Sequence, residues 1–138
     1  MKCVDTTYFI DAIRRPESIK ELTKKLDSEG VHATTVINVY EAFYGAHAIK
    51  DEEYKRKIVE KLSRMIERLV VLSFTYEDAA KAAEIAGNLT LQGIHVGVDA
   101  IVAAIAINNR CEAVITRNEK HFKWIEELTG LRVEGYQV

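Results

Sequence analysis

The chain has few of the residues that break up secondary structure or cross-link small folds. Of its 138 residues only 1 is proline and 7 are glycine, so we expect few long loops and few tight turns. Its 2 cysteines, Cys3 and Cys111, are far apart and form no CxxC pattern, which excludes a zinc or redox motif of that kind. We interpret both as buried small hydrophobic residues, and a disulfide stays open if their segments are neighbours.

The chain also lacks a long hydrophobic run, a secretory leader and an excess of positive charge. Its most apolar stretch, residues 98–107, contains Asp99 and is far shorter than the roughly 20 residues that span a bilayer, so we expect no membrane partner. Residues 1–10 do not have the pattern of a signal peptide, which favours a cytoplasmic protein. The 19 Lys and Arg against 21 Asp and Glu give a net charge of −2, which argues against a protein that coats nucleic acid.

What the sequence does contain is an alternation of strand and helix patterns. Short apolar runs predict buried strands at residues 2–5, 31–33, 70–74, 113–116 and 131–134. Helical spacing predicts helices that open at Thr6 or Thr7, that run from Pro16 up to Gly30, and that cover residues 36–49, 51–69, 76–91, 98–108 and 121–128. This alternation predicts a single α/β domain over residues 1–138, with a buried, mainly parallel sheet of four to five strands.

Three acidic residues stand out because apolar residues surround them. Glu41 is the only formally charged residue between positions 31 and 49, and Asp99 is the only one between positions 90 and 109. Asp5 ends the first predicted strand. Burying a carboxylate is costly unless it is paired, hydrogen-bonded or bound to a cation. Taken singly, Asp5 or Asp99 could cap a helix and Glu41 could pair with a Lys or Arg, so only the set is informative.

Together these acids indicate a metal site at one edge of the sheet. Asp5 and Asn118 each follow a predicted strand, and ligands of open parallel sheets bind beyond the carboxyl ends of the strands. The helices that carry Glu41 and Asp99 can aim both acids at the same edge. Mg²⁺ prefers such oxygen ligands and also binds substrate phosphate, so the set predicts metal-assisted phosphodiester hydrolysis. A generic domain for a phosphorylated ligand is less favoured, because the chain has no Gly-rich phosphate loop.

Four segments carry a resemblance to a known family. VDTTYFID, TTVINVYEAFYG, GVDAIVAAIA and VITRNEKHF follow one another as in the PIN-domain family of metal-dependent ribonucleases, and the chain resembles its small toxins of the VapC type. The resemblance implies a three-layer α/β/α fold and a Mg²⁺ site that also accepts Mn²⁺. Asp5 and Asp99 would be the principal ligands, with Glu41 as a further ligand or water-activating group. It also implies an endoribonuclease with an RNA substrate, which forms a homodimer and is silenced by a small antitoxin.

Two positions depart from the family pattern. Asn118 would be the fourth catalytic residue, but it is an amide and adds no charge, and His121 stands where an acid is frequent. A second metal would therefore be held weakly. The alternative function is a non-catalytic or weakly catalytic PIN-like module that binds RNA or a protein. The resemblance also implies that Thr6 and Thr116 hydrogen-bond the acids or the phosphate.

Basic residues complete the set of candidates. Arg14, Arg15 and Arg117 are expected to flank the acidic edge, where arginine suits bidentate phosphate binding. The many Lys and Arg residues of the helix at 51–69 are better explained as a solvated face. Setting the three solitary acids aside leaves 18 of the 21 acids against 19 bases. The net charge therefore does not exclude an enzyme that cuts RNA through a metal.

Overall fold

The centre of the fold is a short parallel sheet. The computed structural model describes all 138 residues. Its five strands are β1 (Cys3–Val4), β2 (Ala33–Thr35), β3 (Val70–Leu72), β4 (Val114–Thr116) and β5 (Val133–Gly135). All four pairings are parallel, and the strand order is β3-β2-β1-β4-β5. The predicted α/β class and the mainly parallel sheet are confirmed.

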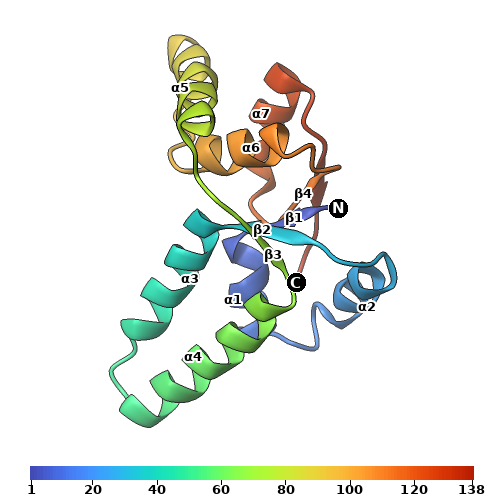
Figure 1. Cartoon of the computed structure of the whole chain (residues 1–138), viewed down its shortest axis with the longest axis vertical. Coiled ribbons are helices and arrows are strands. Elements are labelled where there is room, and N and C mark those ends of the chain that lie inside the picture. Colours follow the sequence, from blue (N-terminus) through green and yellow to red (C-terminus); the bar gives the residue numbers. More distant parts are fainter.

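Seven helices cover the two faces of this sheet, as Figure 1 shows. They are α1 (Thr6–Arg14), α2 (Lys20–Ser28), α3 (Val36–His47), α4 (Glu52–Glu67), α5 (Tyr76–Leu91), α6 (Asp99–Asn108) and α7 (Glu119–Thr129). Helices α5, α6 and α7 form one hydrophobic core with the sheet, and α1, α2, α3 and α4 form the other. The three-layer α/β/α arrangement is therefore confirmed.

The central strands β1 and β4 supply both cores, which explains why these two strands read as continuous apolar runs. Cys3 and Val114 pack in the core of α5 to α7, whereas the next residues, Val4 and Ile115, pack in the core of α1 to α4. Successive strand residues point to opposite faces, so a sheet covered on both sides needs apolar residues at every position. For the same reason α6, which is buried along most of its length, is apolar all round.

Several predicted strands and helices have different limits in the structure. β2 was expected at 31–33 but covers Ala33–Thr35, because Val31 is 64% exposed and lies in the loop before the strand. Thr34 can be fully buried in β2 because its hydroxyl donates to the Val4 carbonyl at 2.8 Å. β3 ends at Leu72 rather than at residue 74. Helix α7 begins at Glu119, two residues before the predicted start.

The remaining features agree with the composition. Cys3 and Cys111 are free and buried, so they act as small hydrophobic residues and form no disulfide. No helix combines the length and the apolar character that crossing a membrane requires. Helix α7 ends at Gly130, whose φ of 80° is a left-handed conformation that glycine adopts without strain.

The strand order reverses beside the central strand, and this marks the place where a ligand crevice is expected. From β1 the chain adds β2 and then β3 on one side, and it later crosses to add β4 and β5 on the other side. The order thus reverses between β1 and β4. In open α/β sheets, such a switch point opens a crevice at the carboxyl ends of the strands, where ligands bind. Asp5 follows β1, and Asn118 lies two residues beyond the end of β4.

Candidate active site

Asp5 lies buried at the junction of β1, α1 and β4. Its Oδ1 accepts hydrogen bonds from the backbone N–H of Thr7, at 3.0 Å, and from the Thr7 hydroxyl. Its Oδ2 accepts a hydrogen bond from the hydroxyl of Thr116 at the end of β4. Asp5 therefore does cap α1, as one reading of the sequence proposed, but it also joins two strands whose residues are 111 apart in the chain.

Burial dominates the electrostatics of Asp5. It raises the pKa of this carboxyl from its ordinary 3.8 to about 6, against the hydrogen bonds from Thr116 and Thr7, which favour the charged form. The negative charge of Asp99 raises the pKa further, so the two acids are close enough to repel each other. Asp5 makes no ion pair with any Lys or Arg of the chain.

Glu41 is held by a chain of hydrogen bonds from the starts of α1 and α3. The hydroxyl of Thr6 donates to Glu41 Oε1 at 2.6 Å and accepts from Asn38 Nδ2 at 2.9 Å. Asn38 in turn accepts a hydrogen bond at 2.7 Å from the hydroxyl of Thr35, which caps α3. Glu41 has no Lys or Arg partner, so the alternative of an ordinary ion pair at this position is excluded.

Asp99 is the first residue of α6 and does not cap it, because the cap position is Val98. Its Oδ2 accepts a hydrogen bond from Asn118 Nδ2 at 3.0 Å and lies 2.9 Å from His121 Nδ1. Burial raises the pKa of Asp99, the hydrogen bond from His121 opposes this shift, and the charge of Glu41 adds to it. Asn118 and His121, the two departures from the family pattern, thus contact the same carboxylate oxygen.

The four predicted catalytic residues therefore converge on one crevice. Asp5 and Asp99 repel each other, Asp99 and Glu41 repel each other, and Asn118 is hydrogen-bonded to Asp99. No three His, Cys, Asp or Glu side chains lie close enough together to form a ready-made metal cage. The crevice is an open cluster of oxygen ligands without a Lys or Arg partner, unlike the closed cages of structural metal sites.

The predicted phosphate-binding arginines are placed differently from the expectation. Arg14 and Arg15 lie at the far end of α1, about 14 Å from Asp5 at the rise of an α-helix, so they do not flank the crevice. Arg117 is close to the crevice, but its Nε donates to the buried carboxylate of Asp11 at 2.8 Å. The hydroxyl of Tyr136 donates to the same Asp11 oxygen at 2.7 Å. This guanidinium fastens the loop after β4 to α1.

Sequence reasoning missed two residues of this network. Asn38 lies one helical turn before Glu41 and is 2% exposed, and it was detectable as a lone polar residue in an apolar segment. Asp11 is 1% exposed and lies between the apolar residues Ile10 and Ala12, so the same signal was present there. Only the fold shows that Arg117 and Tyr136 meet at Asp11, since Tyr136 is 125 residues away.

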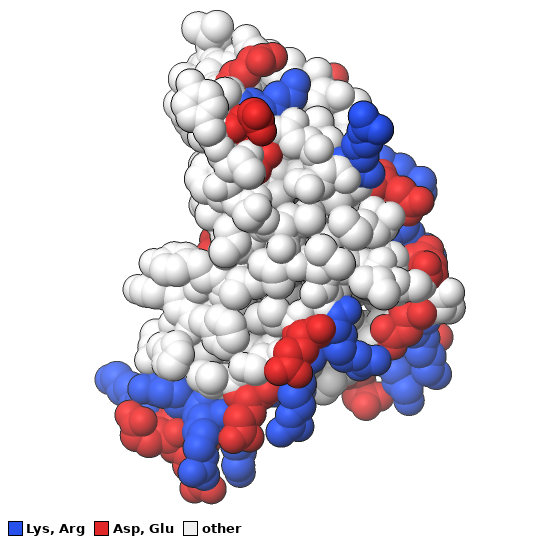
Figure 2. All heavy atoms as spheres, in the orientation of Figure 1, with Lys and Arg blue, Asp and Glu red and all other residues white.

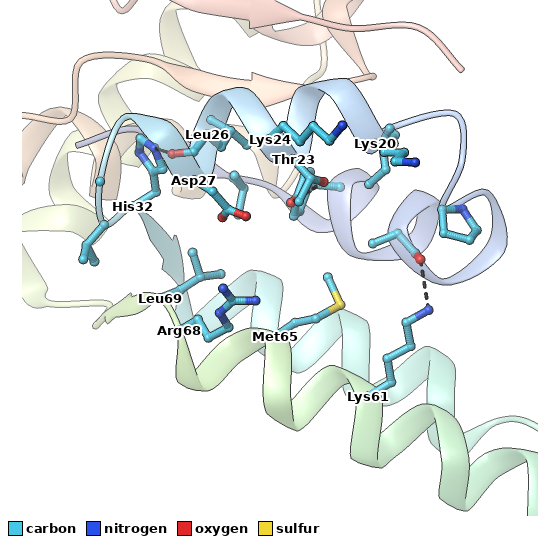
Figure 3. Close-up of a pocket in the computed structure, with 17 residues that line it drawn as sticks. Lys20, Thr23, Lys24, Leu26, Asp27, His32, Lys61, Met65, Arg68 and Leu69 are labelled. Carbon is cyan, nitrogen blue, oxygen red and sulfur yellow. Dashed lines mark hydrogen bonds between the residues drawn. The ribbon is translucent and has the colours of Figure 1, made fainter.

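A large cavity of the protein lies away from the acids. It has a volume of about 710 Å³ and runs between α2 and α4, as Figure 3 shows. Its floor is apolar and includes Leu26, Met65 and Leu69. Its basic lining residues are Lys20, Lys24, Lys61, Arg68 and His32. We call this cavity the α2–α4 groove. Its floor is apolar, and its border is mainly basic.

A second surface feature is an exposed apolar face on α3. Tyr40 and Tyr44 are each 66% exposed, and their ring centroids are 6.1 Å apart. Val36, on the same helix, is 40% exposed. In Figure 2 charged side chains crowd over α4 and along the side of α2, whereas the surface over α3 is almost free of charge. We call Val36, Tyr40 and Tyr44 the α3 patch.

Comparisons with known proteins agree with this geometry. The sequence profile of the PIN domain matches residues 2–128. A search of curated protein sequences finds no match. Among solved structures, a chain of the VapBC2 complex from Rickettsia felis, bound to a promoter DNA fragment, has a TM-score of 0.83 at 24% identity, with 99% of this chain and 98% of that chain covered.

Two further structures are similar over nearly their whole length. A chain of the DNA-bound VapBC complex from Salmonella typhimurium has a TM-score of 0.80 at 26% identity, with 97% and 96% of the two chains covered. A chain of VapBC-5 from Mycobacterium tuberculosis, a toxin–antitoxin system, has a TM-score of 0.67 at 23% identity, with 99% and 98% covered.

The raised pKa of Asp5 predicts a pH-dependent stability. The folded protein holds this proton more tightly than the unfolded chain, so in EDTA its stability falls as the pH rises from about 4 through about 6, by roughly 3 kcal/mol in total. Asp5→Asn stays neutral and removes this fall. Urea unfolding at pH 4.5 and pH 7.5 measures most of this fall, with the exposed Asp27→Asn as the control. An identical pH dependence in Asp5→Asn and the parent would contradict the burial argument.

Proposed function

Since the chain belongs to the PIN domain family, we propose that it is a divalent-metal-dependent endoribonuclease and the toxin of a toxin–antitoxin pair of the VapBC type. The observation that carries this proposal is the convergence of Asp5, Glu41 and Asp99, none paired with a Lys or Arg, at the topological switch point of the sheet. Their mutual repulsion is the feature that a bound cation removes.

The donor set fits Mg²⁺ or Mn²⁺. Hard carboxylate oxygens suit these ions, and Mg²⁺ needs only one or two carboxylates together with water and substrate phosphate, so a preformed cage is not required. In this proposal Asp5 and Asp99 are the principal ligands. A bound ion of this kind lowers the pKa of water and neutralises charge on the phosphate. The neutral amide of Asn118 adds no charge, which favours a single ion.

The protein's own residues prepare the acids for this role. Thr7 and Thr116 donate to both oxygens of Asp5 and so fix the orientation of its carboxylate. Thr6 does the same for Glu41 Oε1, while Glu41 Oε2 makes no hydrogen bond within the protein and is free to accept a proton from water. Glu41 is accordingly the general base of the proposed reaction.

Cleavage of RNA by the purified protein tests the enzyme directly. With Mg²⁺ the parent should cut RNA, and Asp5→Asn or Asp99→Asn should slow cleavage by at least about 100-fold, because each removes a ligand charge. Asp27→Asn, an exposed acid in the α2–α4 groove, is the matched control and should cut like the parent.

If both site variants cut as well as the parent, the enzyme proposal is wrong. The other candidate function, a module that binds RNA or a protein without cutting it, is favoured by the amide of Asn118, which donates its N–H to Asp99. Such a module would take up no Mn²⁺ specifically at the acids. Titration with Mn²⁺ therefore separates an inactive nuclease from a binding module.

The antitoxin proposed as a partner has a suitable docking place in the α2–α4 groove. The similar chains from Rickettsia felis, Salmonella typhimurium and Mycobacterium tuberculosis are components of VapBC complexes. The apolar floor of the groove and its basic border suit an amphipathic helix that carries acidic residues along its sides. Complementary charge of this kind selects partners and speeds their association.

Charge reversal at the border of the groove tests this partner. The double substitution Lys24→Glu with Arg68→Glu should weaken binding of the small protein encoded beside this gene by at least about 10-fold. Lys57→Glu changes an exposed lysine of α4 outside the groove and should bind like the parent. Affinity is measured by calorimetry with both purified proteins. Equal affinity of the reversed variant would exclude the groove as the docking place.

The α3 patch is the surface that we propose for the homodimer. Exposed tyrosines and a valine without neighbouring charge are typical of the apolar centre of an interface. Light scattering should give the parent twice the 15.6 kDa mass of one chain. Tyr40→Glu with Tyr44→Glu should give the monomer mass, because the charges would be buried, whereas the exposed Tyr54→Glu on α4 should stay dimeric. A dimer of the double variant would contradict this assignment.

A further inference from the structure

Helix α7 carries a small aromatic and basic surface beside the acidic crevice. The rings of His121 and Trp124, one helical turn apart, are stacked with centroids 6.1 Å apart and planes 24° apart. The ammonium group of Lys120 lies 5.6 Å from the centroid of the Trp124 ring. We call Lys120, His121 and Trp124 the α7 ledge.

The α7 ledge is attached to the candidate active site through one hydrogen bond. His121 Nδ1 lies 2.9 Å from Asp99 Oδ2, the same oxygen that accepts from Asn118. The His121 side chain is 37% exposed, and its Nε2 makes no hydrogen bond within the protein. The stack therefore begins at the edge of the acids and extends away from them along α7.

Packing alone accounts for only part of this arrangement. Phe122 and Ile125 of the same helix are fully buried and fill the core below α7. Trp124 is only partly buried and touches that core from its margin. Trp124 has one side on the core, and His121 and Lys120 lie against its ring, so the outer part of this cluster is suited to stack a flat aromatic ligand. His121 alone could orient Asp99, but that role needs no tryptophan.

We propose that the α7 ledge is a nucleobase-binding subsite, on which an unpaired base of the RNA stacks while the neighbouring phosphate lies at the acids. The inference rests on the proposed function for the identity of the ligand. Aromatic side chains stack any base, because every base has a π-face, and loss of such a contact costs about 5- to 150-fold in affinity. Lys120 adds a positive charge where the RNA backbone would leave the crevice.

The fluorescence of the protein reports directly on this subsite, because Trp124 is the only tryptophan in the chain. The Asp5→Asn variant keeps the RNA intact and leaves the contact between Asp99 and His121 in place. It is titrated with a short unstructured RNA and with an abasic RNA of the same length and charge, and end-label anisotropy gives both affinities. The base-containing RNA should quench Trp124 and bind about 5- to 150-fold more tightly.

Substitutions in α7 distinguish base stacking on Trp124 from positioning of Asp99 by His121. In the Asp5→Asn background, Trp124→Leu keeps apolar contact with the core and should lose the preference for the base-containing RNA, whereas Trp124→Phe should keep most of it. His121→Asn retains a donor for Asp99 without the ring and should lose part of the preference. Tyr54→Leu, an exposed aromatic residue on α4, is the control. Circular dichroism verifies folding, and the titration of unchanged Trp124 stands whether or not Trp124→Leu folds.

The outcomes test the proposed role of the α7 ledge and the proposed nuclease activity separately. Equal affinity for the two RNAs, or unchanged Trp124 fluorescence while anisotropy reports binding, would contradict the base-binding role of the α7 ledge. Neither result would contradict the proposed nuclease activity. If bases quench Trp124 fluorescence but the parent protein cuts no RNA, the nuclease proposal is wrong and the proposed base-binding role of the α7 ledge stands. Absence of any RNA binding would overturn both.

Discussion

A buried carboxylate in the middle of the sheet is the constraint on which the site depends. Asp5 follows the central strand and is almost completely enclosed, so its charge must be satisfied by neighbours. Hydroxyl groups from α1 and from the end of β4 supply its hydrogen bonds, which tie β1, α1 and β4 together at one point. These bonds do not overcome the effect of burial, and the pKa of Asp5 remains raised. The fold thus buries a carboxylate whose charged form is disfavoured, at the place where the strand order reverses. This buried acid is the basis of the proposed cation site.

The surroundings of Asp5 are arranged so that no basic residue cancels that charge. The arginine nearest to the crevice, Arg117, is held by Asp11 and Tyr136, and its role there is to anchor the loop that carries Asn118. Neutral donors approach the acids instead: Thr6 approaches Glu41, and Asn118 approaches Asp99. Neutral donors orient a carboxylate without removing its charge, so the crevice stays attractive to a divalent cation. A net charge of −2 is therefore compatible with a proposed RNA substrate.

The functional surfaces proposed for the chain lie on separate parts of one small fold. The acids lie at the carboxyl ends of the strands, the α2–α4 groove lies between those two helices, and the α3 patch is exposed. The α7 ledge borders the crevice at Asp99, and it includes His121, one of the two departures from the family pattern. Because Asn118 and His121 both contact Asp99, they act on the same proposed ligand, and they place neutral or basic donors beside it.

The sequence by itself determined the layers of the fold and the identity of the acids. Apolar runs show which segments are buried on both faces, and a lone Asp5, Glu41 or Asp99 within them signals a charge that needs a partner. Periodicity cannot show what lies across the sheet. Only the tertiary structure decided that Thr116 meets Asp5 over 111 residues, that Arg117 is occupied by Asp11, and that Arg14 lies at the far end of α1. Such contacts depend on strand order and register, which arise from the packing of the whole chain rather than from local residue patterns.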